Sequence, residues 1–255
     1  MRKFLISSLI IIALFSCDKK EDNVGFQYPD SKVWKHRVNS IEELKEAIEN
    51  FDGIEVDIFY HPKRNDIYVG HSYADSVNNL RFDDFLSSMK QYKKFSLHTF
   101  FKKRHLCYWL DFKHLDGKNA EQAIQALNII VEKHKIKEKL FIESYSQKAL
   151  KTAKENGYFT MLWVTSLSYK EYKTLHDTIA VMNNIRECIN NVNPDAISCI
   201  SDMFPILCDS FPEQKIHFWD TPKKYTPKNI EFTKKICYNE NVRIVLVDYP
   251  NPIDY

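Results

Sequence analysis

The sequence is poor in glycine, has no paired-cysteine motif and carries little net charge. Only 5 of its 255 residues are glycine, which argues against a glycine-rich loop of the kind that cradles nucleotide phosphates. None of its 6 cysteines forms a CxxC pair, so the chain shows neither a zinc motif of that type nor a dithiol redox motif. A hydrophobic content of 44% and a charged content of 27% are ordinary for a globular protein. The sequence therefore argues against these specialised classes and fits an ordinary globular domain.

The chain also lacks an apolar run long enough for a transmembrane helix. Its longest apolar stretch, residues 4–15, follows Arg2-Lys3 and is shorter than the about 20 residues that a membrane span needs. This layout is typical of a secretory signal peptide. The segment Leu14-Phe15-Ser16-Cys17 resembles a bacterial lipobox, in which the cysteine is lipidated and becomes the first residue. The alternative is an ordinary signal peptide, or a short anchor, with an incidental cysteine.

We therefore expect a lipoprotein signal peptide in residues 1–16, a polar tether in residues 17–31 and one folded domain in residues 32–255. The mature protein would be lipid-anchored through Cys17 to a bacterial membrane, on its periplasmic side or at the cell surface. Removal of Arg2 and Lys3 would reduce the 36 basic residues to 34, equal to the 34 acidic ones. This balance argues against a nucleic-acid partner. The five remaining cysteines are expected as buried free thiols, with one or two disulfides as the alternative.

Short runs of apolar and β-branched residues alternate with helical patterns through the rest of the chain. Strands are expected at residues 33–36, 53–59, 107–112, 140–144, 159–164, 195–200, 215–219 and 242–247, with a short extra strand at 67–70. Between them, helices are expected at residues 40–51, 80–92, 120–134, 146–156, 168–176, 178–190, 203–210 and 226–238. Eight alternating units predict an α/β protein with a (β/α)8 TIM barrel. A doubly wound open sheet is the main rival.

Polar residues stand at or near the ends of four consecutive units of this pattern. They are His36, Glu55, Asp57, His71, Asp111, Lys113 and Glu143. In a (β/α)8 barrel the C-terminal ends of the strands form the face on which active sites lie. Each residue alone is more often an ordinary surface or hydrogen-bonded group, but seven on four units are harder to explain in that way. Acids within apolar strands are costly unless they are paired or bind a metal.

The residue types favour a particular chemistry at this end of the barrel. Glu55 and Asp57 are two residues apart and so point to the same face of their strand. Together with Asp111 they offer three carboxylates, which suit a hard cation such as Mg²⁺ or Ca²⁺, whereas zinc would more often recruit histidines. His36 and His71 beside such a cation suit acid–base chemistry near neutral pH.

Several segments resemble the signature of the glycerophosphodiester phosphodiesterases, a family of phospholipase-C-like TIM-barrel enzymes. They are His36-Arg37, Glu55-x-Asp57, His71, Leu110-Asp-Phe-Lys113, Ile216-His-Phe-Trp219 and Leu246-Val-Asp-Tyr-Pro250. The segments follow the order of the family over residues 33–251. The His-x-x-Asn-Ser and Glu-x-Asp arrangement is also similar to the menorin family.

The sequence departs from the family pattern at three positions. Val38 stands where the family usually has glycine after His-Arg, and Ser72 follows the second histidine where aspartate is usual. Asp111 is one methylene shorter than the family's usual glutamate. These departures bear on the choice of substrate more than on the barrel or on phosphodiester chemistry.

The resemblance implies a metal-dependent hydrolase of glycerophosphodiester-like or phospholipid-headgroup substrates. By resemblance, Glu55, Asp57 and Asp111 would hold one divalent cation, Ca²⁺ or Mg²⁺. His36 and His71 would be the general acid and base, in an order left open. Arg37 and Lys113 would bind the substrate phosphate, and Glu143 and Trp219 would line the pocket. The expected partners are a small-molecule phosphodiester and, through the lipid anchor only, a membrane. The chain is expected to be a monomer.

Two other functions fit the same residues. One is a catalytically weak or inactive barrel lipoprotein that binds a phosphorylated headgroup or a glycan, which the departures at Val38 and Ser72 favour. The other is a metal-free, phosphatidylinositol-lyase-like enzyme that relies on the two histidines. A purely structural lipoprotein would leave the acids and histidines at one barrel end unexplained.

Overall fold

The polypeptide closes into a barrel. The computed structural model describes residues 26–72, 74, 80–91, 106–164, 175–219 and 221–255. In that part of the chain nine strands form one sheet in the order β1-β9-β8-β7-β6-β5-β4-β2-β3, and β1 also pairs with β2. Neighbouring strands are parallel except for β3, which is antiparallel to β2. Eight parallel strands therefore close on themselves, which confirms the (β/α)8 barrel over the open sheet.

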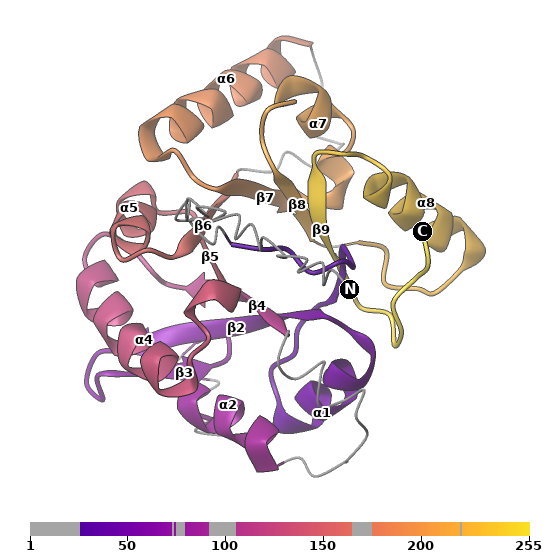
Figure 1. Cartoon of the computed structure of the whole chain (residues 1–255). Coiled ribbons are helices and arrows are strands. Elements are labelled where there is room, and N and C mark those ends of the chain that lie inside the picture. Colours follow the sequence, from indigo (N-terminus) through magenta and orange to yellow (C-terminus); the bar gives the residue numbers. More distant parts are fainter. Residues whose placement is uncertain (1–25, 73, 75–79, 92–105, 165–174, 220) are drawn as a thin grey trace, which may run out of the picture.

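Helices surround this barrel, as Figure 1 shows. The strands are β1 Val33–Lys35, β2 Gly53–His61, β3 Asp66–Val69, β4 Cys107–Lys113, β5 Leu140–Ser144, β6 Phe159–Trp163, β7 Ala196–Ile200, β8 Ile216–Trp219 and β9 Val242–Val247. The helices are α1 Ile41–Asn50, α2 Phe82–Gln91, α4 Ala120–His134, α5 Gln147–Glu155, α6 Leu175–Val192, α7 Ile206–Ser210 and α8 Pro227–Cys237. None of the helices in the described ranges is long and apolar enough to cross a membrane.

Element boundaries differ from the prediction mainly in the helices. The short helix expected from residue 203 begins only at Ile206, because Pro205 occupies its N-cap and proline is disfavoured inside a helix. A turn of 3-10 helix, Ser201–Met203, precedes it. Most of the helix predicted at 168–176 lies outside the described residues, and its last two residues belong to α6. Tyr92, the predicted end of α2, also lies outside them.

The connection between β1 and α1 is held by side-chain caps. The Ser40 hydroxyl accepts a hydrogen bond from the Glu43 backbone N–H at 3.1 Å, and the Glu43 carboxylate accepts one from the Asn39 N–H at 2.8 Å. These reciprocal bonds satisfy backbone donors that the first helical turn leaves open. Because the connection starts at His36, the caps also fix the chain beside the cavity described below.

The lower half of the barrel is filled by large apolar side chains. Those that contact one another in the interior include Trp34, Trp109, Phe141, Phe159 and Met161. Gly53 makes room for this packing, since a Cβ atom there would lie 2.0 Å from Cδ2 of the Trp34 ring. The described residues of the interior below the polar strand ends thus form a packed core.

The segment before β1 closes the bottom of the barrel. Phe26 packs edge-on against Phe141, with ring centroids 4.1 Å apart, and the Tyr28 hydroxyl lies 3.0 Å from Nε2 of the buried His217. Residues 26–31 were predicted to belong to the tether, but Phe26 and Tyr28 pack against the folded domain. The two aromatic rings explain the difference, because they cover apolar side chains that would otherwise face water.

The cysteines of the described ranges are free thiols. Cys107, Cys199, Cys208 and Cys237 are buried, and Cys188 is partly buried. Burial raises the pKa of the Cys199 thiol to about 12, which makes it a poor nucleophile. The expectation of buried free thiols holds for four of the five, and Cys17 lies outside the described residues.

Candidate active site

A cavity of about 390 Å³ opens at the C-terminal ends of the barrel strands. All nine residues singled out from the sequence line it: His36, Arg37, Glu55, Asp57, His71, Asp111, Lys113, Glu143 and Trp219. The cavity is also lined by Trp109, Phe112, His114, Ser144, Tyr145, Trp163 and Leu246. Barrel closure therefore brings together side chains that are spread over 183 residues of sequence, from His36 to Trp219.

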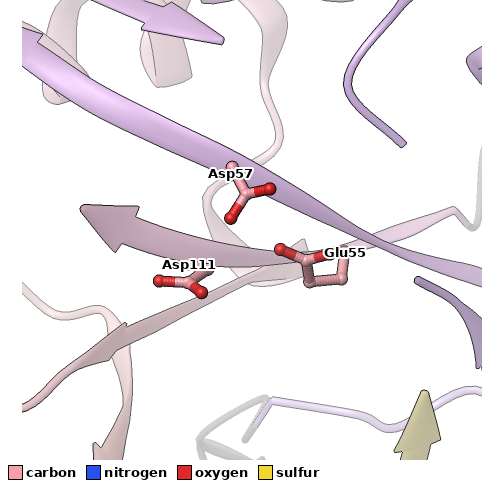
Figure 2. Close-up of side chains that lie close together, drawn as sticks. All are labelled: Glu55, Asp57 and Asp111. Atoms are coloured by element: carbon pink, nitrogen blue, oxygen red, sulfur yellow. The ribbon is translucent and has the colours of Figure 1, made fainter. Parts of the chain in front are cut away.

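Three carboxylates converge on one side of the cavity (Figure 2). Glu55 and Asp57 come from β2 and Asp111 comes from β4, where Asp57 and Asp111 are direct partners in the parallel register. One carboxylate oxygen of each residue lies within 4.8 Å of the others. Glu55 and Asp57 are both only 2% exposed, so their charges are removed from bulk water.

The three carboxylates place more negative charge together than the neighbouring cationic side chain offsets. Burial, followed by the negative charges of Asp57 and Asp111, raises the pKa of Glu55 well above its usual range. Burial also raises the pKa of Asp111, although the nearby Lys113 ammonium opposes that change. Such crowding of buried acids favours a bound cation.

Lys113 is the positive group within the cluster. Its ammonium lies 2.9 Å from Oδ1 of Asp57 and also contacts Oδ2 of Asp111. Burial lowers the pKa of Lys113, but the charges of Asp111 and Asp57 outweigh burial and raise it above the usual lysine value. The lysine is therefore charged at neutral pH and sits at the edge of the acid cluster.

His36 is held between two acids. Its Nδ1 lies 3.1 Å from Oδ1 of Asp248, the residue directly after β9, and its Nε2 lies 3.9 Å from Oε2 of Glu55. The pKa of Asp248 is lowered, because the hydrogen bond and charge of His36 and the charge of Arg37 outweigh its partial burial. A charged Asp248 favours the tautomer with the proton on Nδ1, which leaves Nε2 free to accept a proton on the cavity side.

Arg37 reaches the site through its backbone as well as its side chain. Its N–H donates to Oε2 of Glu55 at 2.7 Å, and its guanidinium lies 3.8 Å from Oδ2 of Asp248. The residue has φ of 57°, a left-handed conformation that costs a non-glycine residue about 1 kcal/mol. This conformation directs its N–H toward Glu55.

The β2–β3 hairpin returns His71 to the acid cluster. Gly70 has φ of 133°, which glycine adopts readily, and its N–H donates to the carbonyl of Asp57 at 2.8 Å. His71 follows at once, with Nε2 at 2.9 Å from Oδ2 of Asp57. Its side chain is 58% exposed, so it lies at the mouth of the cavity rather than at its base.

Glu143 is a buried fourth acid of the cavity, on β5, where it is the register partner of Asp111. Its two carboxylate oxygens accept hydrogen bonds from Nε1 of Trp109, at 3.0 Å, and from the Ser198 hydroxyl. Burial, followed by the charge of Asp111, raises the pKa of Glu143 to about 8. The two hydrogen bonds fix the Glu143 side chain in the wall of the cavity.

Aromatic side chains form the other side of the cavity. The rings of Trp163 and Trp219 are nearly parallel, with centroids 6.5 Å apart and an angle of 17° between their planes. Tyr145, directly after β5, is 61% exposed and lines the same cavity. The site thus joins a charged half to an aromatic half.

Comparison with known proteins gives a match through structure alone. The sequence matches no protein-family model and no curated protein. A glycerophosphodiester phosphodiesterase of Parabacteroides distasonis superposes with a TM-score of 0.59 at 15% identity, over 88% of this chain and 95% of the other. An Oleispira antarctica phosphodiesterase, solved with its product sn-glycerol-3-phosphate, gives 0.58 at 14% identity over 88% and 94%.

A third structure, a glycerophosphodiester phosphodiesterase of Agrobacterium tumefaciens, gives a TM-score of 0.55 at 11% identity over 87% and 98% of the two chains. The chain has the fold of the glycerophosphodiester phosphodiesterases. The resemblance of the sequence motifs had predicted this fold. The match extends over nearly the full length of each phosphodiesterase barrel.

The acid cluster of this phosphodiesterase fold is suited to a divalent metal. All three acids offer oxygen, the ligand atom that Ca²⁺ and Mg²⁺ prefer. Their oxygens are close enough for one ion to touch all three, and two of the residues are buried within β2. Glu55, Asp57 and Asp111 therefore fit as the protein ligands of one cation.

Sequence reasoning missed two residues that orient this site. The Asn39 side chain donates to Oδ2 of Asp57 at 2.6 Å and accepts from the Asp57 N–H at 2.9 Å. Asp248 holds His36, as described above. Asn39 was predicted only as part of the His-x-x-Asn-Ser arrangement at the start of a helix, and Asp248 only as part of a motif, since nothing in linear sequence shows which strand ends meet. The available signal was their position, three residues after the predicted strand 33–36 for Asn39 and one residue after the predicted strand 242–247 for Asp248.

Proposed function

We propose that the protein is a metal-dependent phosphodiester hydrolase acting on glycerophosphodiester-like or phospholipid-headgroup substrates. The observation that carries this proposal is the convergence of two histidines, three carboxylates and two cationic side chains on one cavity of a phosphodiesterase fold. The Oleispira phosphodiesterase holds sn-glycerol-3-phosphate as product, which supports a small phosphodiester as the ligand class here.

The charged residues divide the work of binding the substrate phosphate. Glu55, Asp57 and Asp111 would hold one divalent cation, Ca²⁺ or Mg²⁺, which when bound supplies Lewis-acid polarisation of phosphoryl oxygens. Arg37 and Lys113 would offset the negative charge that develops on the phosphoryl group during transfer. The side chains of Arg37 and Lys113 already line the cavity, so little reorganisation is needed when the substrate binds.

His36 and His71 would carry out proton transfer. One accepts a proton from the attacking water molecule, and the other donates a proton to the oxygen of the leaving alcohol, so that a phosphomonoester and the free alcohol are formed. The contact of His36 with Asp248 keeps its Nε2 free toward the cavity. The contact of His71 with Asp57 holds its ring beside the acid cluster. Asn39 would act as a positioning residue, because it fixes the Asp57 carboxylate.

Hydrolysis of glycerophosphodiesters by the purified protein tests this function. Turnover would be measured with Ca²⁺, with Mg²⁺ and with a chelator, for wild-type, Glu55→Gln and His36→Ala. We expect metal-dependent release of the alcohol, and a loss of about 10²- to 10⁴-fold in rate for His36→Ala. Full turnover in His36→Ala would contradict the mechanism, and activity that a chelator leaves unchanged would favour the metal-free enzyme.

A catalytically weak or inactive binding barrel is the second candidate function. The observation that favours it is the contact of the Lys113 ammonium with Asp57 and Asp111, which neutralises part of the acid cluster. In that case calorimetry would show binding of a glycerophosphodiester without turnover under any metal. Asp83→Asn is a suitable control variant, because that aspartate lies on α2 and is absent from the cavity lining.

We further propose that Cys17 carries a lipid that anchors the protein to a bacterial membrane. Phe26 lies nine residues later, and nine residues span at most about 30 Å. Since Phe26 packs at the N-terminal ends of the strands, an anchor would hold the barrel bottom near the membrane and leave the cavity facing away. Labelled fatty acid should enter wild-type protein, and Cys17→Ser should remain unlabelled.

A further inference from the structure

Lys35, the last residue of β1, contacts the chain directly after β9. Its ammonium donates hydrogen bonds to the backbone carbonyl oxygens of Asp248, at 3.0 Å, and of Tyr249, at 2.7 Å. Asp248 is also the residue whose carboxylate lies against Nδ1 of His36. Two neighbouring residues of β1 therefore contact two different groups of Asp248, because Lys35 binds its carbonyl and His36 binds its carboxylate.

The backbone pairing between β1 and β9 ends one residue before Asp248. The register of the two strands ends with Lys35 opposite Val247, and the His36 N–H donates to the Val247 carbonyl at 3.0 Å. Asp248 follows the end of β9, so its carbonyl is outside the strand pairing. Backbone carbonyls need a hydrogen-bond partner, and the Lys35 ammonium takes the place of a strand neighbour for this one.

The position of the Lys35 ammonium is well defined. The side chain is partly buried, and burial lowers its pKa, although the negative charge of Asp248 opposes that change. The ammonium also lies over the Phe51 ring, 6.0 Å from the ring centroid. Since a partly buried charge is costly unless it is hydrogen-bonded, the two carbonyl oxygens hold the ammonium in this place.

The ring of Tyr249 fixes the chain one residue beyond Asp248. It is fully buried, and its hydroxyl lies 3.4 Å from the Thr233 hydroxyl. The strand on one side and this ring on the other hold the two ends of a short connection. The peptide group between them can still rotate about its flanking dihedrals, and its carbonyl is the one that Lys35 binds. Loss of that contact would let the peptide group turn and would move the Asp248 carboxylate relative to His36.

We propose that Lys35 is a positioning residue of the active site, which holds the Asp248 carboxylate against Nδ1 of His36. This inference rests on the proposed function. The described residues that line the cavity do not include Lys35, so it acts on the reaction only through Asp248 and His36. Its removal should therefore lower kcat and leave KM nearly unchanged.

Lys35→Met tests this role, because it keeps the apolar stem and removes the ammonium. For a glycerophosphodiester, we expect kcat per folded protein, with folding followed by circular dichroism, to fall about 3- to 10-fold while KM changes less than about 2-fold. Lys32→Met is the matched control. The Lys32 ammonium also donates to two backbone carbonyls, those of Cys237 at 2.8 Å and Asn239 at 3.1 Å, but at the opposite end of the barrel. This control should keep the wild-type kcat.

A double-mutant cycle separates positioning through Asp248 from a general loss of structure. In the Asp248→Asn background the carboxylate that Lys35 positions is already gone, so Lys35→Met should lower kcat by less than about 2-fold. An equal fold-loss of kcat in both backgrounds would overturn the inference, and so would wild-type kcat in Lys35→Met alone.

If the wild-type protein hydrolyses no diester, the proposed function fails, and the nitrogen NMR signals of the His36 imidazole decide the inference instead. His36→Gln identifies these signals by their loss. At about pH 8, where histidine is ordinarily neutral, we expect the proton on Nδ1 in wild-type and in Lys32→Met. In Lys35→Met the proton should lie partly on Nε2. Unchanged His36 signals in Lys35→Met would overturn the inference.

Discussion

Replacing Asp248 by asparagine should slow catalysis without weakening substrate binding. The carboxylate of Asp248 lies 3.1 Å from Nδ1 of His36, and the two side chains are 22% and 9% exposed. Asparagine keeps the shape but removes the negative charge, and its amide can turn to donate to Nδ1. That arrangement would place the imidazole proton on Nε2, whereas His36 acting as the general base needs a free electron pair there.

The size of the loss follows from the hydrogen bond that is replaced. Hydrogen bonds to charged groups contribute about 1.5–3 kcal/mol, and each 1.36 kcal/mol corresponds to a factor of ten in rate. We therefore expect kcat to fall about 10- to 150-fold, with KM changed by less than about 3-fold, because Asp248 acts through His36 and is absent from the cavity lining.

Steady-state hydrolysis of a glycerophosphodiester would measure both constants. Asp83→Asn is the matched control, since Asp83 also accepts a hydrogen bond from a histidine, at 2.9 Å from Nε2 of His134, but on the outside of the barrel. It should keep the wild-type kcat. Wild-type kcat in Asp248→Asn would refute the assigned role, and so would a loss confined to KM.

Three further outcomes are expected. Gly53→Ala should lower the free energy of unfolding, measured in urea, by about 1–3 kcal/mol, because the new Cβ would overlap the buried Trp34 ring. In the control Gly117→Ala the new Cβ meets a flexible lysine side chain, so the loss should be smaller. Equal losses in the two variants would contradict this. The pKa of Asp83 is lowered, since hydrogen bonds from its lysine and histidine partners outweigh burial. The contribution of Asp83 to the free energy of unfolding, about 1–2 kcal/mol, should therefore be complete above about pH 5 and be lost as pH falls through its lowered pKa. A stability difference between wild-type and Asp83→Asn that persists near pH 2 would disprove it. Asp111→Asn should weaken Ca²⁺ or Mg²⁺ binding in calorimetry at least about 10-fold, and unchanged affinity would remove Asp111 from the ligand set.

The strand–helix order and the chemistry of the strand ends were readable from the sequence. Alternating apolar residues predict a strand such as β2, and Glu55 and Asp57 are conspicuous because they place charges within that buried strand. Helix starts such as Ser40 were equally visible, because capping depends on residues three apart. Local spacing decides these features, so a linear reading finds them.

Contacts between distant parts of the chain were decided only by barrel closure. Asp248 meets His36 across 212 residues because β9 pairs with β1, and the Phe26 segment packs inward because the open barrel bottom offers it apolar surface. The rings of Trp163 and Trp219 likewise lie nearly parallel only because β6 and β8 end on the same side of the barrel. Sequence alone thus determined which groups this protein carries, and the closed sheet determined which of them touch, since contact across a barrel depends on strand register rather than on spacing along the chain.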